Sequence, residues 1–152
     1  FCSLRLTNTY GPRHQMKNPN QGFLGWFVRT AMDGGTIRVF GNGSQVRDFN
    51  HVSDVASAFL LCASNDSCNG QAYNLGGQAA SVLEAANMAV EIAGTGKVRL
   101  APYPEGHKKV EVGSYVAGIS KIKKLGWAPK MGLSEGLSGM IGFYRKNKQH
   151  YW

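Results

Sequence analysis

Apolar residues recur three and four positions apart in several stretches of the chain, and this spacing predicts helices. In the first such stretch Phe23, Phe27, Val28 and Ala31 fall on one face, and residues 33–35 (DGG) supply a stop signal. The pattern returns further along the chain and gives about five helices. Their expected ranges are 21–32, 54–62 with Ser53 as the N-cap, 81–93, 119–125 and 133–148.

Shorter apolar runs bounded by Gly, Pro or Asn predict strands. The expected strands are residues 1–7, 72–75 and 98–101, and alternation at Val110, Val112 and Tyr115 suggests one more. The first strand is expected to end at Asn8, before a polar loop that runs to about residue 20. The dipeptide Asn42-Gly43 stands between two short apolar runs within residues 39–49, which is the strongest local signal for a β-hairpin.

The order of these elements predicts the fold class. Short mixed strands alternate with the helices, and the chain shows no internal repeat and no low-complexity linker. We therefore expect a single α/β domain, an α+β-like lobe that covers residues 1–152.

Composition narrows the classes of function. The 152 residues include 17 Lys and Arg against 9 Asp and Glu, a net charge of +8, so an anionic partner is expected. No basic run alternates with aromatic residues, which argues against nucleic acid as that partner. Neither a membrane-spanning run nor a signal peptide is recognisable, so we expect no membrane association and a cytoplasmic location. Three cysteines without a CxxC pair favour reduced thiols over disulfides or a zinc site.

Candidate chemistry gathers around the predicted hairpin. Phe40 lies just before the turn and Arg47 just after it. An aromatic ring can stack on a flat ligand, and a guanidinium can bind a phosphate or carboxylate through two parallel hydrogen bonds. The alternative is a surface hairpin with a packed phenylalanine and a solvated arginine.

Five motifs resemble, in order and approximate spacing, those of a known family. They are residues 5–13 (RLTNTYGPR), 39–55 (VFGNGSQVRDFNHVSDV), 73–77 (YNLGG), 125–129 (LGWAP) and 133–137 (LSEGL). Together they are similar to the extended short-chain dehydrogenases, and specifically to the nucleotide-sugar epimerases and dehydratases that use NAD. The resemblance implies that residues 1–20 correspond to the last strand and loop of a dinucleotide-binding fold, and that the rest is a substrate-binding lobe without the main Rossmann sheet.

Two departures from the family pattern bear on activity. The glycine-rich turn that binds dinucleotides between a strand and a helix is not found, because the Gly41-Asn42-Gly43 segment is followed by strand-like residues. The catalytic YxxxK motif of the family is matched in form only by Tyr144 and Lys148, late in the last helix, where Tyr144 continues the apolar face. We therefore expect a nucleotide-sugar-binding part that is not catalytic alone and holds no cofactor by itself, NAD being used by the full-length family.

The resemblance also implies which residues bind substrate. They are Asn8, Phe40, Arg47, Asn74, Lys108 and Lys109, with Phe40 on the base, Arg47 on the diphosphate and the two lysines where the family often has arginine. Asp48 and Asp54 are expected to be structural, holding the hairpin and the start of the next helix. Trp127 is expected to pack on the last helix, and Gly118 removes a cap that the family commonly has.

Partners follow from the same comparison. In the family fold the strand at residues 1–7 lies inside a parallel sheet, so here its edge is bare and invites pairing with another chain. We expect a homodimer, or a separate chain that carries the dinucleotide-binding half, with a nucleotide sugar or nucleoside diphosphate as ligand. The alternative function is a stand-alone binding or assembly module that kept the fold without enzymatic activity.

Overall fold

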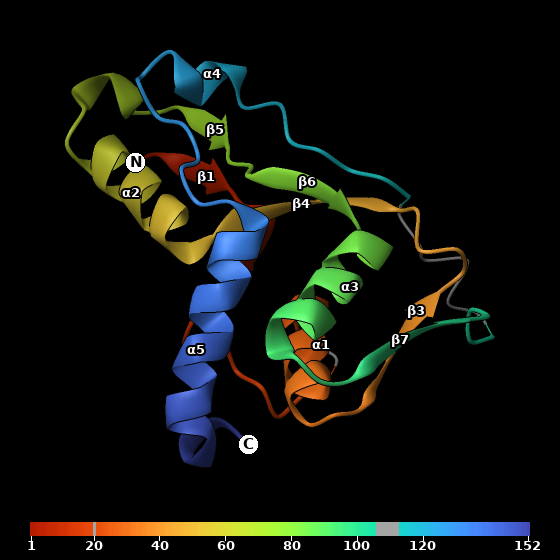
Figure 1. Cartoon of the computed structure of the whole chain (residues 1–152). Coiled ribbons are helices and arrows are strands. Elements are labelled where there is room, and N and C mark those ends of the chain that lie inside the picture. Colours follow the sequence, from red (N-terminus) through yellow and green to blue (C-terminus); the bar gives the residue numbers. More distant parts are fainter. Residues whose placement is uncertain (20, 106–112) are drawn as a thin grey trace.

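A computed structural model describes residues 1–19, 21–105 and 113–152. Short strands and helices alternate along this chain, as the hydrophobic pattern predicts (Figure 1). The elements are β1 (Ser3–Arg5), β2 (Asn8–Tyr10), α1 (Phe23–Met32), β3 (Thr36–Phe40), β4 (Val46–His51), α2 (Val52–Ala63), the 3₁₀ turn η1 (Asp66–Cys68), β5 (Ala72–Asn74), β6 (Gln78–Ser81), α3 (Val82–Ala93), β7 (Lys97–Ala101), α4 (Ser120–Lys123) and α5 (Leu133–Tyr151).

The described strands form three small sheets. β1 pairs with β5 in parallel, and β3 pairs with β7 in parallel. β4 lies between β2, which is parallel to it, and β6, which is antiparallel. β3 and β4 therefore belong to different sheets, and the predicted β-hairpin over residues 39–49 is wrong.

The Asn42-Gly43 segment does form a turn, but the turn connects two sheets. Gly41 and Gly43 have φ values of 68° and 71°, and the Asn42 side chain accepts a hydrogen bond from the Ser44 backbone N–H at 3.0 Å. Beyond the turn, the carbonyls of Gly43 and Gln45 accept hydrogen bonds from the first residues of α3 instead of from β3. The local turn signal was correct, and the strand partners come from distant parts of the chain.

The first predicted strand divides into two. β1 pairs with β5, whereas β2 crosses to the β4 sheet, where Asn8 aligns with Phe49 and Tyr10 with His51. The expected end of strand structure at Asn8 is therefore wrong, and the Gly11-Pro12 pair ends β2 instead. Tyr10 is buried against α5, which explains why a polar-looking segment continues in strand conformation.

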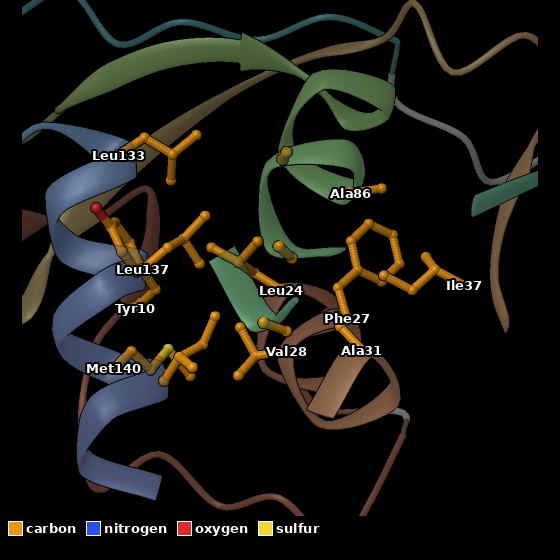
Figure 2. Packing of buried hydrophobic residues seen from close by; sticks show 14 of the residues in the cluster. Tyr10, Leu24, Phe27, Val28, Ala31, Ile37, Ala86, Leu133, Leu137 and Met140 are labelled. Carbon is orange, nitrogen blue, oxygen red and sulfur yellow. The ribbon is translucent and has the colours of Figure 1, made fainter. Parts of the chain in front are cut away.

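Two hydrophobic cores hold these sheets and helices together. The larger lies between α1, α3 and α5, where Leu24, Val28, Ala86, Leu137 and Met140 meet (Figure 2). The second lies beneath α2, and its members include Val55, Ala58, Leu75, Ile122 and Trp127. The apolar faces predicted for α1, α3 and α5 are thus the faces that pack. On α2, Val55, Ala58 and Cys62 pack as predicted, but Phe59 is 52% exposed.

Two of the described α-helices, α2 and α3, have a side-chain cap at the amino end, whereas α1, α4 and α5 have none. Ser81, where the third helix was expected to begin, caps α3 in a capping box with Glu84. The predicted N-cap of α2, Ser53, is wrong, because His51 caps this helix through its Nδ1, which accepts the Ser53 backbone N–H at 3.3 Å. α4 has Ile119 at its N-cap position and no side-chain cap, so Gly118 lies one residue before the cap position.

Two buried carboxylates hold backbone segments that are distant in the sequence. Asp48 accepts backbone N–H groups from Gly77 at 2.6 Å and Ala117 at 2.8 Å, and Asp54 accepts those of Lys130 and Met131. Both are structural, as predicted, but they hold distant loops and not a hairpin or their own helix.

Trp127 does not pack on the last helix. Its indole N–H lies 3.1 Å from the Asp54 carbonyl and 3.0 Å from the Ser57 hydroxyl, so the predicted packing on α5 is corrected to packing on α2.

The strand suggested by Val110, Val112 and Tyr115 is not found at Tyr115, which lies outside any strand. Val110 and Val112 lie outside the described residues. Among the described helices, none combines the length and apolar character that crossing a membrane requires.

Candidate functional site

Phe40 and Arg47 line the same cavity, which has a volume of about 250 Å³. Phe40 is the last residue of β3 and Arg47 the second of β4. The tight turn between the two strands brings both side chains to one opening although the strands do not pair. Arg38, Gln45 and Tyr103 contribute further polar groups to the wall, and Phe23 and Phe27 contribute further aromatic rings.

One side of the cavity is aromatic. The rings of Phe40 and Tyr103 have centroids 6.0 Å apart and an interplanar angle of 34°. The Tyr103 hydroxyl accepts a hydrogen bond from the Gln45 side-chain amide. Tyr103 also lies directly over Gly41, since a Cβ atom there would come within 2.8 Å of the Tyr103 ring. Gly41 therefore makes room for the second ring.

Another part of the cavity wall is positively charged. Arg47 donates from Nη1 to the carbonyl of Val46 at 3.2 Å and to the carbonyl of Gly113, which fixes the position of the guanidinium. Arg38 adds a second guanidinium, and the described lining residues include no carboxylate. A cavity with two arginines and no acid favours an anionic ligand.

Sequence reasoning missed several lining residues, and Arg38 and Tyr103 bear most on the chemistry of the cavity. Arg38 is exposed on β3, where buried and more exposed residues alternate. It is aligned with Arg99 of β7, so two positive charges are neighbours on paired strands. That cross-strand pairing is not visible in the sequence. Tyr103 follows β7 in a Pro-Tyr-Pro segment, and an aromatic residue between two prolines was the only signal available.

Asn8 lines a second cavity of about 200 Å³, together with Tyr10, His14 and Met140. Its side-chain amide donates to the Asp48 carbonyl at 3.2 Å, which links β2 to β4. Phe23 lines both cavities, so the Asn8 cavity adjoins the one at Phe40. Burial raises the pKa of the Tyr10 hydroxyl in this second cavity.

The remaining predicted binding residues are not brought to these cavities by the described structure. Asn74 ends β5, aligns with Arg5 of β1, and lines neither cavity. Lys108 and Lys109 lie outside the described residues. Of the six predicted residues, the structure thus brings Phe40 and Arg47 together and places Asn8 next to them.

In the formal YxxxK match at Tyr144 and Lys148, the tyrosine is packed in the core, as predicted. Tyr144 is fully buried, its hydroxyl donates to the His14 carbonyl at 2.7 Å, and burial raises its pKa to about 12. The Lys148 ammonium lies 2.7 Å from Asp33 Oδ1. Each group is engaged in holding α5 to the rest of the fold.

Comparison with known proteins decides the family. The model of the NAD dependent epimerase/dehydratase family matches residues 1–76, which is half of the chain. The chain belongs to this family. Its sequence is 31% identical to UDP-glucose 4-epimerase from Mycolicibacterium smegmatis over 97% of the chain and 47% of that protein. It is 29% identical to dTDP-glucose 4,6-dehydratase from Streptomyces griseus over 97% of the chain and 43% of that protein.

The fold shows the same family relationship. A crystal structure of UDP-glucose 4-epimerase with UDP-glucose from Thermotoga maritima matches with a TM-score of 0.81 and 29% identity, over 95% of this chain and 46% of that one. The expected fold class, a mixed α/β lobe like part of an extended short-chain dehydrogenase, is confirmed. The chain spans about half the length of the curated relatives that it matches.

Proposed function

We propose that this chain is the nucleotide-sugar-binding part of an NAD-dependent epimerase or dehydratase, and that the cavity at Phe40 and Arg47 holds the nucleoside diphosphate. The observation that carries the proposal is the convergence of two aromatic rings and two guanidinium groups on one cavity. A nucleoside diphosphate has a flat base and an anionic diphosphate, which require these two kinds of group. The Thermotoga maritima relative was solved with a ligand of this class, UDP-glucose.

Each part of the ligand has a partner of suitable chemistry. The Phe40 and Tyr103 rings present apolar faces on which a base can stack. Arg47 and Arg38 offer planar guanidinium groups that match the geometry of phosphate oxygens. The sugar then extends toward Asn8, because the second cavity adjoins the first at Phe23. Asn74, Lys108 and Lys109 stay in the proposal as predicted contacts.

The catalytic step requires a hydride acceptor, which in this family is NAD. Residues 1–20 correspond in our proposal to the end of the dinucleotide-binding fold, and residues 21–152 to the substrate lobe. The chain alone is expected to bind a nucleotide sugar without turning it over. NAD-dependent turnover of a UDP-, GDP- or dTDP-sugar by the pure chain would contradict this part of the proposal.

The surface around β1 supports the need for a partner. In the described part of the chain β1 pairs with β5, and no strand pairs with its other edge. On the adjoining helix α2, Phe59 is 52% and Leu60 72% exposed, and α2 lies on the side of the molecule away from α1 and α3 (Figure 1). A second chain that covers this surface would bury apolar area and pair the strand edge. We propose a homodimer, or a separate chain that carries the dinucleotide-binding half.

A second candidate is a binding or assembly module without enzymatic activity, which the exposed face of α2 also favours. Isothermal titration with a panel of nucleoside diphosphates and their sugars separates the two candidates. Micromolar binding to any member of the panel supports the nucleotide-sugar proposal, whereas no heat with all of them supports the module. The free cysteines suit a reducing compartment, so the cytoplasm stays our predicted location.

A further inference from the structure

Three thiols lie together in the second core, apart from the cavity at Phe40 and Arg47. Cys62 is in the last turn of α2, Cys68 is in η1, and Cys2 directly precedes β1. All three are free. Cys68 is 0% and Cys62 9% exposed, whereas Cys2 is partly exposed. The function proposed above uses none of these thiols.

Backbone hydrogen bonds hold Cys2 next to the turn that carries Cys68. The Gly70 N–H donates to the Phe1 carbonyl at 2.7 Å, and the Ser3 N–H donates to the Gln71 carbonyl at 2.9 Å, so Cys2 is fixed on both sides. The Gln71 N–H in turn bonds the Cys68 carbonyl at 3.1 Å. Cys62 and Cys68 belong to one hydrophobic cluster, and Cys2 packs against it.

Cys62 is the central thiol of the three. It interacts with the thiols of both Cys68 and Cys2. Burial, followed by these two thiols, raises the pKa of Cys62 to about 12, so Cys62 is protonated at neutral pH. The thiolate is the reactive form of cysteine, and an oxidant in solution must also reach the sulfur. Cys62 is therefore poorly suited to react first, and exposure favours Cys2.

We propose that Cys2 and Cys62 form a disulfide when the protein meets a peroxide, with Cys2 as the attacked thiol and Cys62 as the resolving thiol. The Cys2 sulfur, having lost its proton, attacks one peroxide oxygen, and the O–O bond breaks. This leaves a sulfenic acid on Cys2, and the departing hydroxide takes up the thiol proton to form water. The Cys62 sulfur then attacks the sulfenic sulfur, the S–O bond breaks, and a second water leaves with the Cys62 proton. The two thiols supply the two electrons that reduce the peroxide.

This bond joins the start of β1 to the end of α2. These two elements form the surface that we propose to be covered by a second chain. Oxidation therefore adds a covalent link between the start of β1 and α2, where Cys2 and Leu4 already pack against the cluster that includes Val55, Ala58 and Cys62. The disulfide itself does not depend on the proposed nucleotide site, so either proposal can fail without the other.

The experiment treats the chain with hydrogen peroxide, blocks the remaining thiols with an alkylating reagent, and identifies linked peptides by mass spectrometry. The wild type is compared with Cys2→Ser, Cys62→Ser and Cys68→Ser. We expect a Cys2–Cys62 link in the wild type and in Cys68→Ser. We expect no such link in Cys2→Ser and Cys62→Ser. A predominant Cys62–Cys68 link, or sulfinic acid on Cys2 without any link, would overturn the proposal.

A denatured sample supplies the matched control. In an unfolded chain the Cys62–Cys68 pair closes a much shorter loop than the Cys2–Cys62 pair, so loop entropy favours it. We expect the predominant link to change from Cys2–Cys62 in native buffer to Cys62–Cys68 in denaturant. The same product in both states would show that the native fold does not select the pair. Circular dichroism of each reduced variant checks that it is folded. If Cys62→Ser does not fold, the wild type and Cys68→Ser still show which two cysteines pair.

Discussion

The ring centroids of Phe40 and Tyr103 lie 6.0 Å apart with an interplanar angle of 34°, although Phe40 ends β3 and Tyr103 follows β7, far along the chain. Parallel pairing of these strands brings their carboxyl ends to the same place, and Gly41 leaves room for the second ring. The aromatic side of the cavity is therefore a product of topology, and it can be tested apart from the charged side.

Replacing Tyr103 tests the aromatic side. Stacking of a base on an aromatic side chain is worth about 1–3 kcal/mol, so Tyr103→Ala should weaken nucleoside diphosphate binding by about tenfold. Tyr103→Phe keeps the ring and should bind nearly as the wild type does. Titration calorimetry measures both variants. Equal affinity of Tyr103→Ala and the wild type would remove Tyr103 from the site.

Asn50 provides a prediction about stability. It is fully buried on β4, and among the described residues neither of its side-chain amide atoms has a hydrogen-bond partner. A buried amide without a partner costs about 1–3 kcal/mol, so Asn50→Val should raise the free energy of unfolding by about 1 kcal/mol. Urea denaturation measures the change in the free energy of unfolding. Asn42→Ala serves as a comparison: it removes the side-chain acceptor of the Ser44 backbone N–H and should destabilise the protein. A less stable Asn50→Val protein would contradict the assignment.

His51 predicts a pH dependence of stability. Burial lowers its pKa below the usual 6.5, although the charges of Asp54 and Glu135 act in the opposite direction. The folded state thus binds the proton more weakly than the unfolded state, and stability falls as the pH drops through 6.5 toward the lower folded value. Protonation also removes the Nδ1 acceptor that caps α2.

Urea denaturation at pH 7.5 and pH 5.5, which lie about one unit either side of the usual histidine pKa, measures this effect. The wild type is compared with His51→Asn, which keeps a capping acceptor but does not titrate. The variant should lose less stability on acidification than the wild type. His150→Asn, at an exposed position, serves as the control and should behave as the wild type does. An unchanged pH dependence in His51→Asn would exclude His51 as the source.

The exposed face of α2 predicts self-association. Light scattering of the wild type at high protein concentration should give the mass of a dimer, and Leu60→Glu should give a monomer because it places a charge in the proposed contact. Leu100→Glu is the control, since Leu100 is also half exposed but lies on β7. A monomeric wild type at high concentration would count against the homodimer and leave the separate-chain form of the proposal.

The sequence predicted the elements whose signals are local. The ranges of α1, α3 and α5 followed from helical spacing and from stops and caps such as Ser81, all within a few residues of the element. β6 was missed because residues 78–81 carry little apolar pattern and depend on pairing with β4.

The hairpin and the site show the same limit. Asn42-Gly43 signals a turn, but only the distant strands β7, β2 and β6 decide that β3 and β4 separate. Phe40 and Arg47 were found because they flank that turn. Arg38 and Tyr103 were not, since their place in the cavity depends on the β3–β7 pairing, which no local pattern reports.

Titration of the chain with UDP, for the wild type and for Arg47→Ala, tests the central claim most directly. A hydrogen bond to a charged group is worth about 1.5–3 kcal/mol, so micromolar binding by the wild type should weaken by about tenfold to a hundredfold in Arg47→Ala. Arg47→Lys should retain part of the wild-type affinity. Arg99 is aligned with Arg38 but does not line the cavity, so Arg99→Ala should leave the affinity unchanged. Undiminished binding in a folded Arg47→Ala protein would contradict a nucleoside diphosphate site at Phe40 and Arg47.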